Sequence, residues 1–278
     1  MTISAAPDPG EGWGADGTDD TRPSDGAADS LPAGAWDLPA ATDPAAIEPA
    51  TEDSYWSISR TPLMSLVFSL PLVTAYEGGV LILGRGTARN GADVWLRTLL
   101  DQLGFGEYFL LPILTVLGLL AWHHVEHDRW QWRSDVLMGM LVECGFWAVI
   151  LVGIARLQDR FWPLAAGAAE GFLSRFVAFC GAGLYEEVLF RLLLMPALAW
   201  GLARLGATPA AAAVWAVFGS SLLFSIAHYV GPLGDAFDPY SFTFRFLAGG
   251  FFAVLFAIRG FGIAAGSHAA YDMLVGLV

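Results

Sequence analysis

Lysine is absent from this 278-residue sequence, and its 14 basic residues, all of them arginine, are outnumbered by 27 acidic residues. A chain with a net charge of −13 has no basic surface to neutralise nucleic-acid phosphates, so DNA and RNA are excluded as partners. Charged residues of either sign are scarce, at 15%, whereas 55% of residues are hydrophobic and the mean hydropathy is +0.54. So little charge is atypical of a soluble domain of this size and predicts a membrane protein.

Cysteine is almost absent as well. The two cysteines, Cys144 and Cys180, lie in apolar runs without CxxC spacing, so they indicate neither a disulfide framework nor a thiolate zinc site. The helical zinc motif HExxH does not occur in the sequence either. We therefore expect both cysteines to fill space between apolar helices.

The first sixty residues hold twelve acidic residues and two arginines, so most of the negative charge belongs to this segment. The segment is rich in Asp, Ala, Pro, Gly and Thr and poor in branched aliphatic residues. Such a composition cannot bury enough apolar surface to offset the entropy lost on ordering. We therefore predict a disordered acidic tail over residues 1–60 and a transmembrane domain over residues 61–278.

Apolar stretches follow one another through the rest of the chain. They are Leu63–Leu83, Tyr108–Trp122, Val136–Ala155, Phe172–Tyr185, Val188–Ala203, Ala210–Val230, Phe242–Ile258 and Phe261–Val278. Several approach the ~20 residues that a helix needs to cross ~30 Å of hydrocarbon, and lipid offers backbone groups no partners. The sequence therefore predicts an all-α, polytopic bundle of six to eight transmembrane helices. The number stays open because residues 172–203 can form one kinked helix or two short ones.

Ionisable residues inside apolar stretches are few, and the first group is Glu186, Glu187 and Arg191. A charge within a span costs at least ~2.5 kcal/mol, so these side chains should face the interior of the bundle. Glu187 and Arg191 are four residues apart, with the acid first, which favours an ion pair within one helix. Glu186 points ~100° away around the helix and is therefore the candidate reactive carboxylate.

Two further polar groups follow in later apolar stretches. His228 ends an apolar helix, and Phe224 lies on the same face one turn earlier. His268 and Asp272 are four residues apart on one face of the last apolar stretch. Three helices can therefore offer polar side chains to a common point, an arrangement that packing alone does not explain.

With these motifs, the chain resembles the CPBP intramembrane proteases, which include the type II CAAX prenyl endopeptidases and proteins tied to bacteriocin processing and immunity. The family pattern EExxxR matches Glu186, Glu187 and Arg191, and FxxxH matches Phe224 and His228. HxxxN matches His268 with Asp272 in the place of asparagine. The resemblance covers approximately residues 170–278. It implies an intramembrane endopeptidase in which Glu186 is the general base, His228 helps to hold the water and His268 binds the oxyanion.

Asp272 leaves two arrangements open, because an ionised carboxylate cannot donate to an oxyanion. The carboxyl group is either protonated and donates, or it is ionised and holds His268 as an imidazolium. We favour the imidazolium because the i,i+4 spacing allows the contact within one helix.

Metal dependence is also open. The side chains of Glu186, His228, His268 and Asp272 are of the types that bind zinc with a water in an open position. A metal-free mechanism uses the same atoms, and we favour it slightly.

A rival metal motif, HxxEH, occurs at His123, Glu126 and His127. Because it lies at the end of an apolar stretch among tryptophans and arginines, we interpret it as an interfacial belt.

The expected function is hydrolysis of a peptide bond in a membrane-associated protein or peptide, in the plasma membrane of a bacterium. Glu77 and Glu143, which lie in apolar stretches without a motif partner, are interpreted as packing or access-path residues. Two other classes of function remain open. A non-enzymatic immunity or scaffold protein needs the helices but not the chemistry, and a proton-coupled small-molecule transporter uses intramembrane acids and histidines.

Overall fold

A computed structural model describes residues 54–84, 89–159, 171–231 and 234–277, and these residues are helical apart from their connections. The described segments contain no strand, so the prediction of an all-α fold is confirmed. Residues 1–53, most of the predicted tail, lie outside the described residues. The last seven residues of the predicted tail are described, and they contain the short helix α1, Tyr55–Ile58.

The remaining helices follow in chain order. They are α2 (Pro62–Leu83), α3 (Gly91–Gln102), α4 (Leu110–Val125), α5 (Ser134–Asp159), α6 (Phe172–Gly181), the π-helical segments η2 (Ala182–Glu186) and η3 (Val188–Leu194), α7 (Met195–Arg204), α8 (Pro209–Ala227), α9 (Pro239–Arg259) and α10 (Phe261–Gly276). Helices α2, α5, α8 and α9 are long and apolar enough to cross a membrane. The polytopic membrane class is thus confirmed. By length and composition, the described helices supply four of the six to eight predicted spans.

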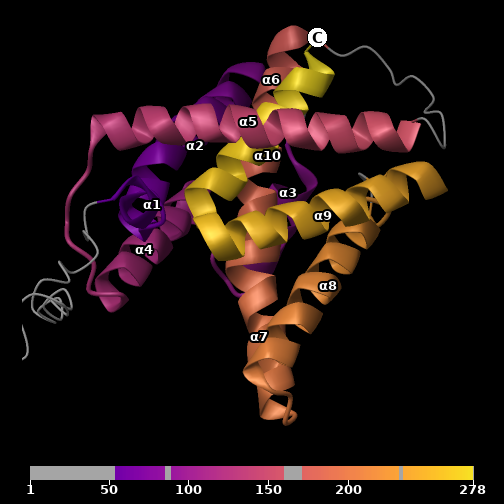
Figure 1. Ribbon diagram of the computed structural model, residues 1–278. Helices are drawn as coiled ribbons and strands as arrows, with labels where there is room; N and C mark the ends of the chain where they lie inside the picture. The colour runs from indigo at the N-terminus through magenta and orange to yellow at the C-terminus, as the bar shows by residue number, and fades with distance from the viewer. Residues whose placement is uncertain (1–53, 85–88, 160–170, 232–233, 278) are drawn as a thin grey trace, which may run out of the picture. The chain divides into compact units, whose positions relative to one another are not determined.

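Residues 172–204 form one uninterrupted helical run, in which η2 and η3 separate α6 from α7 (Figure 1). Pro196 has no backbone N–H, and in a regular α-helix its ring clashes with the carbonyl of residue 192. π-helical turns lie just before it, and the helical run continues unbroken through it. The choice between one kinked helix and two short ones is therefore settled in favour of one irregular helix.

Helix α10 is the element around which the site is assembled. It packs against α5, α2, α9, α6 and η2, and its residues from Phe261 to Ala269 are buried. Small residues make this possible, because Gly262, Gly266 and Ala265 let neighbouring helices approach its backbone closely. Helix α8 in turn packs between α7 and α9 (Figure 1). These contacts bring η2, the end of α8 and the middle of α10 together.

Glu143 holds α5 to the end of α9 and to α1. Arg259 donates from Nε to Glu143 Oε1 at 2.6 Å and from Nη2 to Oε2 at 2.7 Å. The hydroxyl of Tyr55 donates to Oε2 of the same carboxylate, and the Trp147 indole donates to Oε1 at 3.1 Å. The bidentate pair identifies Glu143 as a packing residue in this structure.

Substituting Gly183 should show how closely η2 and α10 must approach. A Cβ atom at this position would lie 2.7 Å from the backbone nitrogen of Ala269 and 2.8 Å from the carbonyl oxygen of Ala265. Because backbone atoms cannot rotate away, Gly183→Ala should lower the free energy of unfolding by about 1–3 kcal/mol. Gly201→Ala is the matched control, because no atom lies within 4 Å of its Cβ position. Thermal unfolding in detergent should show a lower melting temperature for the first variant and not for the second.

Candidate active site

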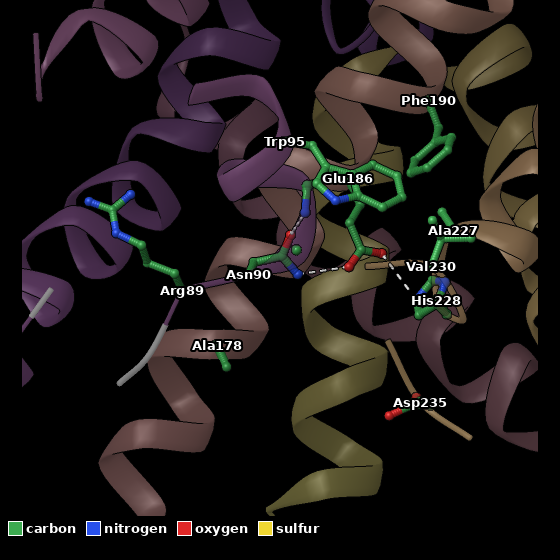
Figure 2. Close-up of a pocket in the computed structure, with 12 residues that line it drawn as sticks. Arg89, Asn90, Trp95, Ala178, Glu186, Phe190, Ala227, His228, Val230 and Asp235 are labelled. Atoms are coloured by element: carbon green, nitrogen blue, oxygen red, sulfur yellow. Dashed lines mark hydrogen bonds and ion pairs between the residues drawn. The ribbon is translucent and has the colours of Figure 1, made fainter. Parts of the chain in front are cut away.

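Glu186 ends the π-helical segment η2, and its two carboxylate oxygens have different partners. Oε1 accepts a hydrogen bond of 2.8 Å from the side-chain amide of Asn90. Oε2 lies 3.8 Å from Nε2 of His228 and 3.8 Å from Nε2 of His268. The carboxylate is thus anchored by one oxygen and presents the other to two imidazoles. Figure 2 shows the contacts of Glu186 with Asn90 and His228.

His228 is the C-cap residue of α8, directly after Ala227. Its Nδ1–H donates to the carbonyl oxygen of Phe224 at 2.8 Å. Since a carbonyl can only accept, this bond places a proton on Nδ1, and in the neutral ring the lone pair of Nε2 faces Glu186. A separation of 3.8 Å is too long for a direct hydrogen bond and suits one bridging water.

His268 lies on α10 and is held on three sides. Its Nδ1–H donates to Glu187 Oε1 at 2.7 Å, and its ring stacks on Phe252 with centroids 4.3 Å apart. Oδ2 of Asp272 lies 3.7 Å from Nε2. The sequence favoured Asp272 as the carboxylate that holds His268. The contact with Asp272 is present, and His268 donates its direct hydrogen bond to Glu187, because the close approach of η2 and α10 brings a carboxylate 81 positions away in the sequence to Nδ1.

The predicted ion pair between Glu187 and Arg191 is present, with Oε1 and Nη1 3.2 Å apart in a fully buried setting. Nη2 of Arg191 also donates to the carbonyl of Gly249 at 2.9 Å. The guanidinium lies 4.5 Å from the ring centroid of Phe224, within the range of a cation–π interaction. Phe224 therefore packs between the buried arginine and His228, whose ring centroid is 4.9 Å from its own.

Two cavities meet at Glu186 and His228, which line both of them. The first, of about 340 Å³, is drawn in Figure 2 and is also lined by Asn90, Trp95, Phe190 and Asp235. The second, of about 430 Å³, is also lined by His268, Asp272, Phe224, Phe252 and Tyr271. The convergent polar groups thus border open space in both cavities.

Among the residues that the structure describes, no three His, Cys, Asp or Glu side chains form a group that could hold a metal ion. The two histidines of the rival HxxEH motif do not lie on one helix. Helix α4 ends at Val125, and His127 lies beyond its end with a positive φ of 57°. The ring of His123 is buried against Trp130, whereas His127 is exposed.

Three features of the site were not predicted from the sequence. Asn90 binds Glu186, Glu187 binds His268, and Phe252 stacks on His268. Asn90 carries a local signal as a residue type favoured at helix starts, but nothing in its spacing points to a residue 96 positions later. Glu187 was assigned to Arg191 alone.

Glu187→Gln should destabilise the protein strongly. The substitution leaves Arg191 charged and buried without its counter-ion, and removing one partner of a buried pair costs about 3–5 kcal/mol. Arg133→Gln is the control, because it removes an exposed pair with Asp135 and should leave the melting temperature unchanged. Equal melting temperatures for both variants and the wild type would show that the buried pair does not stabilise the bundle.

The comparisons with known proteins concern the same part of the chain. Residues 167–274, which contain all three motifs, match the family model described as type II CAAX prenyl endopeptidase Rce1-like. No curated protein and no solved structure matches the chain with significant similarity. The family resemblance predicted from the motifs is confirmed. Residues 167–274 of this membrane protein are therefore similar to the Rce1-like family of type II CAAX prenyl endopeptidases.

Proposed function

We propose that the chain is an intramembrane endopeptidase in which Glu186 activates a water molecule for attack on a peptide bond. The observation that supports this proposal is the convergence of Glu186, His228 and His268. They come from η2, the end of α8 and α10, and the two histidines face one carboxylate oxygen at 3.8 Å. Peptide hydrolysis needs a base, a positioned water and an oxyanion donor, and these three side chains can supply them.

The attacking water lies between Glu186 and His228. Oε2 of Glu186 and Nε2 of His228 are both acceptors, so one water can donate one hydrogen to each. Its oxygen lone pair is then free to attack the carbonyl carbon. Glu186 takes a proton as the new C–O bond forms and passes it to the amine nitrogen as the C–N bond breaks. The products are a carboxylic acid and an amine.

His268 is the proposed oxyanion donor. Because Nδ1–H already donates a hydrogen bond to Glu187, Nε2 can donate one only when the ring is doubly protonated. Three carboxylates surround this ring, from Glu187 at 2.7 Å, Asp272 at 3.7 Å and Glu186 at 3.8 Å. Their charge favours the imidazolium, which then faces the developing oxyanion. Asp272 contributes to this field from the position where many CPBP proteases carry asparagine.

The proposed substrate is a membrane-associated protein or peptide that enters from the lipid bilayer. The description of the matched family supports a prenylated CAAX tail as the first substrate to test. The aromatic side chains of Phe224, Phe252 and Tyr271 give the second cavity apolar walls for such a chain. We further propose that the protein resides in the plasma membrane of a bacterium.

Glu186→Gln should lower the rate of peptide cleavage by about 100- to 10,000-fold, because the amide cannot accept the proton of the water. Glu126→Gln is the matched control, since it removes the carboxylate of the rival HxxEH motif and should leave the rate unchanged. Purified protein in proteoliposomes and fluorogenic prenylated CAAX peptides provide the measurement.

Three outcomes would overturn the proposal. Cleavage that depends on Glu126 and not on Glu186 would move the active site to the rival motif. Proton-dependent uptake of a small molecule without cleavage would identify a transporter. Full biological activity of Glu186→Gln would support an immunity or scaffold protein.

Chelation should leave cleavage intact, because the proposed chemistry uses Glu186 and the two histidines without a metal ion. The measurement is the cleavage rate before and after incubation with a strong zinc chelator, together with the metal content of the active protein. Loss of activity that added zinc restores would show that the mechanism is that of a metalloprotease.

A further inference from the structure

Asn90 makes two side-chain hydrogen bonds that together determine the orientation of its amide. It is the N-cap of α3, and its Oδ1 accepts a bond of 2.8 Å from the backbone N–H of Ala92. The opposite end of the amide, Nδ2, therefore carries the hydrogens and donates to Oε1 of Glu186 at 2.8 Å (Figure 2). One residue thus begins a helix and holds the proposed catalytic base.

The backbone of Asn90 is held in turn by α2 and α3. Its N–H donates to the hydroxyl of Tyr76 at 3.0 Å, and this hydroxyl donates to Oδ2 of Asp93 at 3.0 Å. Nη1 of Arg89 donates to the same carboxylate oxygen at 2.7 Å. Tyr76 and Asp93 are completely buried, so these bonds are shielded from competing water.

The same network continues from Asp93 to Tyr185, the residue before Glu186. Arg97 donates from Nε to Oδ1 of Asp93 at 2.6 Å and from Nη2 to Oε1 of Glu77 at 2.9 Å. The hydroxyl of Tyr185, the residue before Glu186, donates to the same Glu77 oxygen at 2.5 Å. The hydrogen bonds and the peptide bond between residues 185 and 186 therefore close a ring.

We infer that Asn90 is a positioning residue for Glu186. The ring of hydrogen bonds fixes the position of Asn90 relative to Glu186. The inference rests on the proposed role of Glu186 as the base. A carboxylate rotates easily about its last torsion, which is broad and has no strong preferred angle. By occupying Oε1, the amide leaves Oε2 as the oxygen that faces both histidines. Glu77, which has no motif partner in the sequence, acquires a role in this ring.

The inference also places a positioning residue outside the segment that matches the family. Asn90 precedes residues 167–274 by more than seventy positions, on a helix of 12 residues that is too short to cross a bilayer. The active site is thus completed by the N-terminal helices and does not belong to the matched segment alone.

Asn90→Ser tests the inference, because serine keeps the N-cap and loses the donor to Glu186. We expect kcat for peptide cleavage to fall about 10- to 100-fold, the effect of one hydrogen bond to a charged group, with KM and the melting temperature unchanged. Asn90→Asp also keeps the cap but places a second carboxylate against Glu186. It should lower kcat further than serine does, because two adjacent carboxylates resist joint ionisation. A purely structural role predicts that kcat falls in these variants only where the melting temperature falls as well.

Tyr185→Phe provides an independent test if the Asn90 variants fold poorly. It removes the bond to Glu77 at the far side of the ring, and we expect a lower kcat at unchanged KM. Thr98→Ala, at an exposed position of α3 outside the ring, is the control with wild-type kcat. Wild-type kcat in both Asn90→Ser and Tyr185→Phe, with Glu186→Gln inactive, would overturn this inference alone. Wild-type activity of Glu186→Gln would instead overturn the proposed function.

Discussion

The carboxylate of Glu187, shared between Arg191 and His268, is the interaction on which the site depends. All three side chains are buried, and a buried charge is tolerated only when it is paired. Glu187 compensates the guanidinium on its own helix and at the same time fixes the ring of His268 on α10. One acidic side chain therefore joins the packing of the bundle to the orientation of a proposed catalytic group.

The backbone on either side of this carboxylate is irregular. Residues 182–194 are π-helical on either side of Glu187, and Gly183 lets this segment approach the backbone of α10. Adjacent acidic side chains on such a segment reach different partners. Glu186 contacts Asn90 and the two histidines, the second of them at Nε2 of His268. Glu187 contacts Arg191 and the other ring nitrogen of His268, Nδ1. π-helical turns are found frequently at functional sites, and here they occur at two neighbouring glutamates that have different partners.

The buried acids of the membrane domain also differ in what surrounds them. Glu143 is bound by a bidentate arginine, and Glu77 by Arg97 and Tyr185, so both are committed to holding helices together. Glu186 instead lines both cavities, and one of its oxygens faces the two histidines at 3.8 Å. This contrast distinguishes a carboxylate available for chemistry from those whose hydrogen-bonding capacity is used in packing.

The sequence alone determined the features that arise from local spacing and composition. Apolar stretches predicted membrane helices, the i,i+4 spacing predicted the pair of Glu187 with Arg191, and the three motifs identified the family. It could not determine which carboxylate bonds His268 or that Asn90 reaches Glu186, because those partners are 81 and 96 positions apart. Contacts of this range depend on how closely helices pack and on where a π-helical turn shifts the register. Only the tertiary structure decides these, since the periodicity of one helix carries no information about the distance to the next.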